Sequence, residues 1–252
     1  LLLVPLENEI VHTYIVNNDW IGTYGYIKNI KFWRPDPTGK WRYILWDTDL
    51  GMGLDSYFGY DLLDVALNPP DSNPHSSLMK KLLNNNTFKN QFINRYADLI
   101  NYHLETSRLT ELAQTFRNSL IPEMGRHFLK WADTTIANPY TLGEAYDIAS
   151  WNAKYSSLIG FMIMRPQFAR NFVQTYFQLQ NQSDLILDVQ PPEAGRIKIS
   201  TIWPEEFPWQ GTYFNGVPVK LEVQTSPGYE FVQWEGDFNF SRLGQQNRIK
   251  LC

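Results

Sequence analysis

The sequence predicts an α+β fold, with a mostly helical first part that carries a β-hairpin and a small antiparallel all-β module at the end. Apolar residues recur at spacings of three and four through residues 75–178, which indicates amphipathic helices. Two β-type runs, Lys28–Arg34 and Trp41–Trp46, flank a turn rich in proline and glycine, and this pattern predicts a hairpin. From about Leu185 the spacing changes to two, as in strands that have one buried face.

The helical part divides at its turn and cap signals. A stripe over Glu9–Asn17 predicts a first helix before the hairpin. Pro122 predicts a kink within one long helix, and Pro166 suits the first position of another. The helices predicted after the hairpin lie around Leu78–Leu83, Phe88–Ile100, Leu109–Trp131, Leu142–Met164 and Pro166–Phe177.

The last part of the chain reads as a small β module. Turns that contain proline or glycine separate its alternating runs, which predict strands at Arg196–Ser200, Val217–Val223 and Glu230–Trp234. We interpret Asn181–Asp184 as the linker that precedes this module. The predicted domains are therefore residues 1–180 and 185–252.

Composition excludes several classes of protein. Hydrophobic residues make up 43% and charged residues 19% of the 252 residues, a globular balance. The net charge of −4 argues against a general nucleic-acid surface, so no nucleic-acid partner is expected. The longest apolar run, Leu158–Met164, is far shorter than the ~20 residues of a membrane helix, so no membrane span is expected in this fragment. The single Cys252 excludes intrachain disulfides and Cys-rich zinc sites, and the four histidines lack a metal-ligand spacing.

Four polar residues around the hairpin are the candidates for chemistry: Asp19, Asn29, Asp47 and Asp49. Asp19 lies on the loop after the first helix, Asn29 begins the first strand, and Asp47 ends the second. Because strand ends meet at the open side of a hairpin, Asn29 and Asp47 are expected close together, with Asp19 entering from the loop. Carboxylate and amide oxygens suit Mg²⁺, and this order of residues follows the logic of metal-dependent phosphoryl transfer. A structural role for acidic residues at strand ends is the alternative.

These motifs resemble the CotH kinase family, the spore-coat CotH proteins and their secreted bacterial relatives, which are atypical members of the protein-kinase-like fold. The resemblance covers roughly residues 1–180 and implies the C-terminal lobe of a kinase-like domain. The segments that carry it are Asn17–Trp20, Asn29–Arg34, Trp41–Gly53, Leu82–Leu99 and Met164–Pro166.

The resemblance also implies an activity and roles for the candidate residues. It implies transfer of the γ-phosphoryl group of ATP to Ser or Thr hydroxyls of a protein substrate, with ATP and Mg²⁺ or Mn²⁺ as cofactors. Asp19 matches the catalytic Asp, which orients or deprotonates the acceptor hydroxyl. Asn29 and Asp47 match the residues that bind the metal and, through it, the nucleotide. Asp49 is a further candidate ligand of the metal.

Two features depart from the family's pattern. The interval between Asp19 and Asn29 is longer than in similar relatives. Only 18 residues precede Asp19, too few for the N-terminal lobe that supplies a phosphate-contacting Lys or Arg, its Glu partner and a phosphate-covering loop. We therefore expect a fragment that begins within the domain, and kinase activity if the full protein has that lobe.

The β module resembles small β domains of bacterial surface proteins, notably in the ending Phe231–Gly236. This resemblance implies a truncated β-sandwich-like module, a secreted or cell-surface location, and a surface-layer or extracellular partner. Two alternatives to the kinase stay open: a non-catalytic pseudokinase scaffold on the cell surface, and an adhesion protein that binds carbohydrate through a Trp-rich face. Against the second, Trp20, Trp33, Trp41 and Trp46 are expected mainly in the core.

Overall fold

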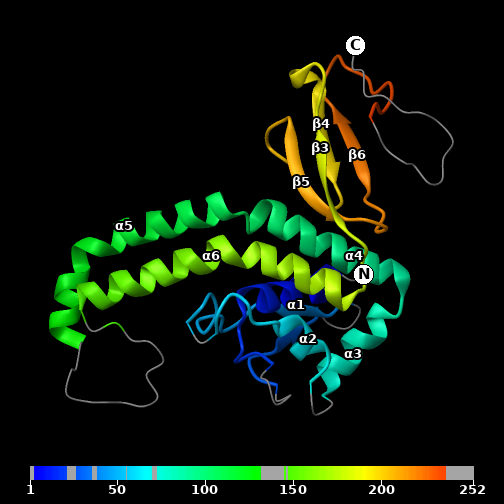
Figure 1. Cartoon of the computed structure of the whole chain (residues 1–252). Coiled ribbons are helices and arrows are strands. Elements are labelled where there is room, and N and C mark those ends of the chain that lie inside the picture. Colours follow the sequence, from blue (N-terminus) through cyan, green and yellow to red (C-terminus); the bar gives the residue numbers. More distant parts are fainter. Residues whose placement is uncertain are drawn as a thin grey trace. The chain divides into compact units, whose positions relative to one another are not determined.

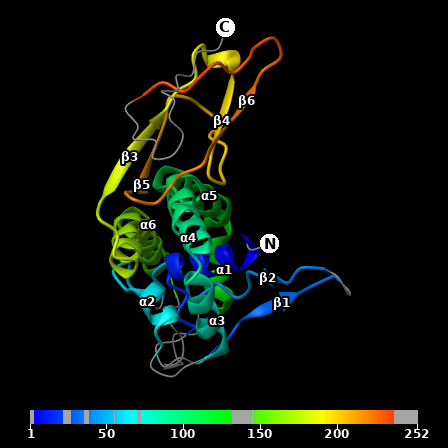
Figure 2. The ribbon, with the colours of Figure 1, turned by 90° about the vertical axis from the view of Figure 1, so that its right-hand side faces the viewer.

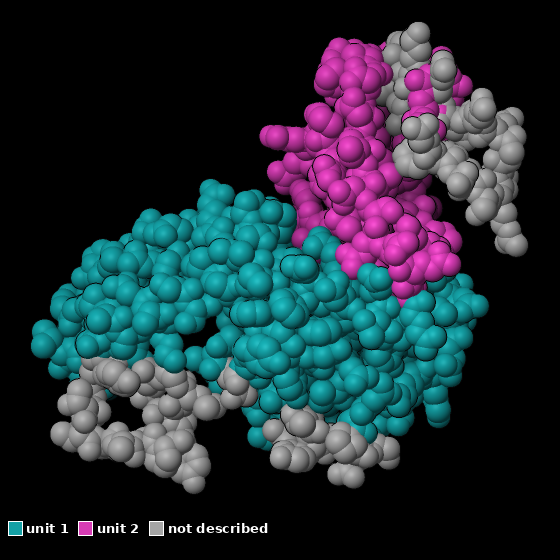
Figure 3. Space-filling model, in the orientation of Figure 1, with its two compact units in different colours: residues 1–92, 104–178 teal, residues 93–103, 179–252 magenta. Residues whose placement is uncertain are grey.

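A computed structural model describes residues 3–21, 27–35, 39–54, 56–69, 73–131, 145 and 147–236. It confirms the predicted α+β fold, in which helices dominate and the strands form small antiparallel sheets (Figure 1). The chain divides into two compact units, which Figure 3 shows in different colours. The first contains residues 1–92 and 104–178, and the second contains residues 93–103 and 179–252.

Helices form most of the first unit. Asp61, Asn73 and Asp147 each begin a helix by accepting a hydrogen bond from the backbone N–H three residues later. No helix among the described residues is both long enough and apolar enough to cross a membrane. The helices are α1 (Leu3–Ile15), α2 (Leu62–Leu67), α3 (Pro74–Leu83), the first part of α4 (Asn86–Asp98), α5 (Thr106–Trp131) and α6 (Ile148–Tyr176).

The predicted hairpin is confirmed, although its strands are shorter than the β-type runs. β1 (Lys31–Trp33) and β2 (Arg42–Ile44) pair antiparallel, with Phe32 opposite Tyr43 at the centre of the register. Figure 2 shows the hairpin reaching away from the helices of the first unit.

The buried guanidinium of Arg165, on α6, joins α6 to the end of α1 and to a loop before α2. Its Nε donates to the Tyr14 carbonyl at 2.7 Å, and one terminal nitrogen donates to the Thr13 carbonyl at 2.6 Å. The other terminal nitrogen donates to the carbonyls of Phe58 and Tyr60 at 2.6 and 2.9 Å. The last carbonyls of a helix lack partners within the helix and carry partial negative charge, so a cation at this position suits them well.

The neighbouring carbonyls of α1 also have partners. The N–H of Asn17 donates to the His12 carbonyl at 3.0 Å, and the N–H of Met52 donates to the Ile15 carbonyl at 2.6 Å. Val16 then leaves the helix in the left-handed region, with φ of 57°. All four terminal carbonyls of α1 are therefore hydrogen-bonded, and these bonds fix where the following loop begins.

α6 is one continuous helix, which corrects the prediction of two helices meeting at Pro166. A proline inside a helix cannot donate to the carbonyl four residues earlier, which here belongs to Met162. The hydroxyl of Thr106, on α5, donates to that carbonyl at 3.4 Å and replaces the missing bond. The helix also begins later than predicted, at Ile148, because Asp147 forms a capping box before it. Of the predicted start, residues 142–144 and 146 lie outside the described residues.

The second unit contains two antiparallel pairs of strands and a helical segment. β3 (Gln182–Leu187) pairs with β5 (Trp209–Phe214), and β4 (Gly195–Ile199) pairs with β6 (Leu221–Thr225). A 3₁₀ turn, Pro192–Ala194, precedes β4. The helical segment holds the end of α4 and a π-helix, Leu99–His103.

Only part of the predicted strand pattern is correct. The interpretation of Asn181–Asp184 as a linker is wrong from Gln182 onward, because Asp184 accepts hydrogen bonds from Gln210 and Thr212 of β5 at 2.9 and 2.8 Å.

The strand predicted at Arg196–Ser200 is confirmed as β4, and that at Val217–Val223 begins later, after Pro218, which cannot donate to a strand ladder. The run Glu230–Trp234 forms no strand in the described structure, and only Phe231 within it takes part in a β-bridge. Phe231 contacts Trp234 three residues later with ring centroids 5.4 Å apart, and an extended chain would separate them.

Buried polar contacts hold the helical segment and the strands of the second unit together. The Asp98 carboxylate accepts hydrogen bonds from the Thr201 N–H at 2.9 Å and from the Tyr213 hydroxyl at 2.7 Å. The Asn101 side chain both donates to and accepts from the Thr212 backbone, at 2.9 and 3.1 Å. Residues 93–103 therefore belong to the same compact unit as the strands, although they lie within the helical part of the sequence.

Replacing Arg165 with Lys is expected to destabilise the first unit by about 3 kcal/mol or more, because an ammonium cannot reach four carbonyls and leaves buried acceptors unpaired. Urea unfolding followed by circular dichroism measures the effect. Arg126→Lys, an exposed change on α5, serves as the matched control. A loss no larger than that of the control would contradict the role given to Arg165.

Asp98 is expected to make the second unit less stable as the pH rises from about 4 to about 6. Burial raises the pKa of Asp98 to about 6, and its hydrogen bonds only partly oppose this. In this range the folded carboxyl keeps a proton that the unfolded chain releases, so stability falls as the pH rises, by on the order of 3 kcal/mol in total. Hydrogen exchange across this pH range measures the effect.

Asp98→Asn keeps the shape of the side chain but cannot ionise. The difference in stability between the parent and this variant should therefore change with pH in the same window. A constant difference from pH 4 to pH 7 would show that the carboxyl does not titrate with a raised pKa.

Candidate metal and nucleotide site

Asn17 links the loop of Asp19 to the segment of Asp47. It lies two residues after the end of α1, its side chain is fully buried, and its Nδ2 donates to the Asp47 carbonyl at 2.7 Å. The same nitrogen lies 3.1 Å from Nδ1 of His12. The Asn17 carbonyl accepts from the N–H of Trp20 at 3.2 Å, which turns the chain at Asp19. Sequence reasoning gave Asn17 no role of its own, although its place between a helix end and an acidic loop was a usable signal.

Asp19 and Asn29 lie side by side, because their side chains are hydrogen-bonded to each other. Asn29 Nδ2 donates to Asp19 Oδ2 at 3.1 Å, and Lys28 Nζ lies 2.9 Å from Asp19 Oδ1. Asn29 has a φ of 52°, in the left-handed region that asparagine tolerates better than most residues. The Lys28 side chain is 56% exposed, so this ion pair orients the carboxylate more than it stabilises the fold.

Asp47 and Asp49 form an adjacent acidic pair after β2. A hydrogen bond with the Asp49 side chain raises the pKa of the exposed Asp47, and slight desolvation and the negative charges of Asp49 and Asp19 raise it further. Three carboxylates therefore repel one another here, and a divalent cation would relieve that repulsion. Within the described residues, no three Asp, Glu, His or Cys side chains lie close enough together to hold a metal ion. Carboxylates alone therefore do not complete a metal site, although their chemistry suits a hard cation.

A tight turn after the acidic pair anchors this segment to α1. The N–H of Gly51 donates to the Thr48 carbonyl at 3.1 Å, and Met52 then bonds to the Ile15 carbonyl. A Cβ at Gly51 would lie 2.9 Å from two side-chain carbons of Ile15, so this close approach requires glycine. The turn therefore holds the acidic pair against the end of α1.

The hairpin next to the acidic pair exposes aromatic rings. Trp33, Trp41 and Trp46 are 47%, 53% and 47% exposed, so the expectation that they lie in the core is wrong. The strands are exposed along most of their length, which leaves these rings uncovered. Lys31 Nζ lies 3.2 Å from the centroid of the Trp46 ring, and its charge lowers the pKa of Asp47. Sequence reasoning missed Lys31 as a cation near the acidic pair.

Trp20, in contrast, lies in the core as expected, within a buried cluster behind the acidic loop. Its ring stacks on His12 at 4.6 Å and meets the edge of His75 at 5.3 Å. His75 Nε2 pairs with the buried Glu9 carboxylate at 2.8 Å. Burial, together with nearby His75, lowers the pKa of His12 to about 4, so His12 is neutral at pH 7. These contacts hold Trp20, and with it the loop that carries Asp19, in a fixed position.

The comparisons with known proteins identify the family. The profile of the CotH kinase protein family matches residues 6–169, which is more than half of the chain. No curated protein and no solved structure matches the sequence. The matched range contains all four candidate residues and the buried arginine of α6. The chain belongs to the CotH kinase protein family.

Proposed function

We propose that this chain is part of an atypical protein kinase that transfers the γ-phosphoryl group of ATP to a Ser or Thr hydroxyl of a secreted or surface protein. One observation supports the proposal: in a chain of the CotH kinase family, Asp19 is hydrogen-bonded to Asn29, and its negative charge reaches Asp47, which is hydrogen-bonded to Asp49. Hard oxygen donors at one place suit Mg²⁺ or Mn²⁺, which supplies charge neutralisation to phosphoryl transfer.

Asp47 and Asp49 would hold the cation, with Asn29 beside them. The Nδ2 of Asn29 is committed to Asp19, which leaves its amide oxygen as the atom that can face a cation. Lys31, close to Asp47, offers a positive charge for the phosphates. These three kinds of group supply the metal ligands and part of the charge that a triphosphate requires.

Asp19 would act on the acceptor hydroxyl. Its two oxygens are oriented by Lys28 and Asn29, and each oxygen keeps a lone pair for a further hydrogen bond. In the transfer, the acceptor oxygen bonds to the γ-phosphorus, the bond to the β–γ bridging oxygen breaks, and ADP leaves. The hydroxyl proton passes to the Asp19 carboxylate.

The exposed rings of the hairpin would bind the nucleobase. Trp46 directly precedes Asp47, and Trp41 lies on the same hairpin beneath the guanidinium of Arg34, 5.0 Å from its ring centroid. A planar base stacks favourably on such rings.

The same exposed rings favour a second candidate function, carbohydrate binding by an adhesion protein, because sugars also stack on tryptophan. That function is favoured if the parent protein binds glycans but not ATP, and if Trp33→Ala and Trp41→Ala each lose the glycan binding.

Asp47→Asn is expected to lower phosphoryl transfer about a hundredfold or more, because the variant keeps the shape of the side chain but loses the charge that holds the cation. Transfer from labelled ATP with Mg²⁺ or Mn²⁺, measured on the longest natural form of the protein, tests this. Asp64→Asn, an exposed change on α2, is the matched control. If the parent labels no protein and binds no ATP in a metal-dependent way, the kinase proposal fails and a surface scaffold is the better account.

Asn17→Ala is expected to weaken Mn²⁺ binding about tenfold, because Asn17 positions Asp47 without touching the cation. Isothermal titration with Mn²⁺ measures the affinity, and circular dichroism checks the fold. Asn118→Ala, on the exposed surface of α5, should leave the affinity unchanged. Equal affinities for the parent and a folded Asn17→Ala protein would remove this positioning role.

A further inference from the structure

α5 and α6 lie side by side as an antiparallel pair (Figure 1), and apolar side chains of α5 remain exposed in the described structure. In α5, Leu109 is the only buried residue, and the buried residues of α6 all lie from Phe161 onward. Two helices alone cannot bury the apolar faces of both, so helices are ordinarily packed against a further element. The part of α5 after Leu109 and the part of α6 before Phe161 therefore present a surface against which another element can pack.

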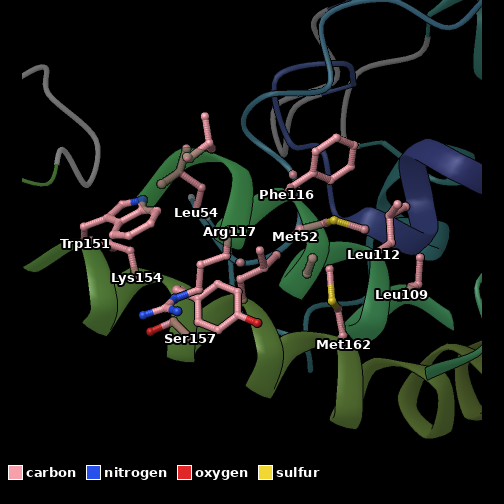
Figure 4. Close-up of a pocket in the computed structure, with 16 residues that line it drawn as sticks. Met52, Leu54, Leu109, Leu112, Phe116, Arg117, Trp151, Lys154, Ser157 and Met162 are labelled. Atoms are coloured by element: carbon pink, nitrogen blue, oxygen red, sulfur yellow. The ribbon is translucent and has the colours of Figure 1, made fainter. Parts of the chain in front are cut away.

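A groove of about 520 Å³ runs along this surface (Figure 4). Its volume is in the range of sites that bind ligands. α5, α6 and the turn after the acidic pair all contribute to its walls. The apolar residues that line it include Met52, Leu54, Leu109, Leu112, Phe116 and Met162.

The α5 wall continues as an exposed apolar stripe. Leu112, Phe116 and Leu120 follow one another at intervals of four residues and are 49%, 60% and 52% exposed. The stripe is about 12 Å long, since each helical residue adds about 1.5 Å. Apolar residues at this spacing on one helix are the usual surface against which a second amphipathic helix packs.

The charges of the groove have one sign. Among the described residues that line it, Arg117 and Lys154 are the only charged ones. Arg117 is held in place, because it donates to Asn152 at 2.8 Å and lies 5.0 Å from the Tyr155 ring centroid. No carboxylate among the described residues forms an ion pair with Lys154. Figure 4 shows Lys154 at one end of the groove and Leu109 near the other, so the groove is cationic at one end and apolar at the other.

We infer that this groove binds an amphipathic helical segment of the acceptor protein, with its apolar face on the α5 stripe and an acidic residue at Lys154 and Arg117. The inference rests on the proposed kinase function, because it identifies the occupant as the protein substrate. Residues 51–54 line the groove and directly follow Asp47 and Asp49 in the sequence. A segment bound there keeps its neighbouring residues close to the acidic site.

Fluorescence anisotropy with two synthetic peptides tests this inference on the whole chain without ATP or metal. The probe is a labelled helical peptide of about 18 residues, roughly 27 Å long, with Leu at every third or fourth position and Glu in its last turn. Its twin carries Lys in place of Glu. The Glu peptide should bind at least about fivefold more tightly than the Lys peptide, and Lys154→Glu should reverse that preference.

Phe116→Ser should weaken binding of the Glu peptide about tenfold, because it removes an exposed apolar anchor without disturbing a buried one. Leu129→Ser is the matched control, since Leu129 is a 91% exposed residue of α5 outside the groove. Equal binding of the two peptides, or no effect of Phe116→Ser, would overturn the inference. A parent dimer that Phe116→Ser abolishes in light scattering would overturn it as well, in favour of self-association.

Asp47→Asn separates this inference from the proposed function. That variant should bind the Glu peptide as tightly as the parent does. Peptide binding with the predicted charge preference, but no phosphoryl transfer by the parent, would remove the kinase function as the reason for the groove and so overturn its assignment to an acceptor. Phosphoryl transfer without that charge preference would overturn the groove assignment alone.

Discussion

The hydrogen bonds that terminate α1 are the constraint on which the first unit depends. The buried guanidinium of Arg165 donates hydrogen bonds to the carbonyls of Thr13 and Tyr14. The backbone N–H groups of Asn17 and Met52 donate to the neighbouring carbonyls of His12 and Ile15. A buried cation is costly unless every donor finds an acceptor. Here a helix end and a loop supply those acceptors. The position of the α1 terminus is therefore set by a residue about 150 positions away in the sequence.

The candidate site inherits its geometry from that terminus. Asn17 lies two residues after α1 and bonds to the Asp47 carbonyl, while the turn at Gly51 packs on Ile15, so the acidic loop and the acidic pair are both held by the end of α1. The site is thus built on a helix end rather than on two independent loops, which favours the fixed geometry that metal-dependent phosphoryl transfer needs. In the proposed account, the turn at Gly51 that packs on Ile15 also lines the groove between α5 and α6, in which the protein substrate binds.

Local patterns in the sequence predicted the elements whose causes are local. The hairpin followed from a Pro- and Gly-rich turn between β-type runs, and it was confirmed by the pairing of β1 with β2. Contacts between distant residues were not predictable in this way. The Thr106 hydroxyl that bonds to the Met162 carbonyl, where Pro166 cannot donate, lies on another helix. The exposure of Trp33 and Trp41 depends on whether distant parts of the chain pack against the hairpin. Arg165 acts through the backbone carbonyls of distant residues, which no side-chain pattern reveals.

The central claim is that Asp19, Asn29, Asp47 and Asp49 together form a site for a divalent cation and ATP. The most direct test is electron paramagnetic resonance of Mn²⁺ titrated into the longest natural form of the protein with and without ATP. The account predicts saturable Mn²⁺ binding that ATP strengthens and that Asp47→Asn weakens strongly. Mn²⁺ binding that is indifferent to both ATP and Asp47→Asn would contradict it.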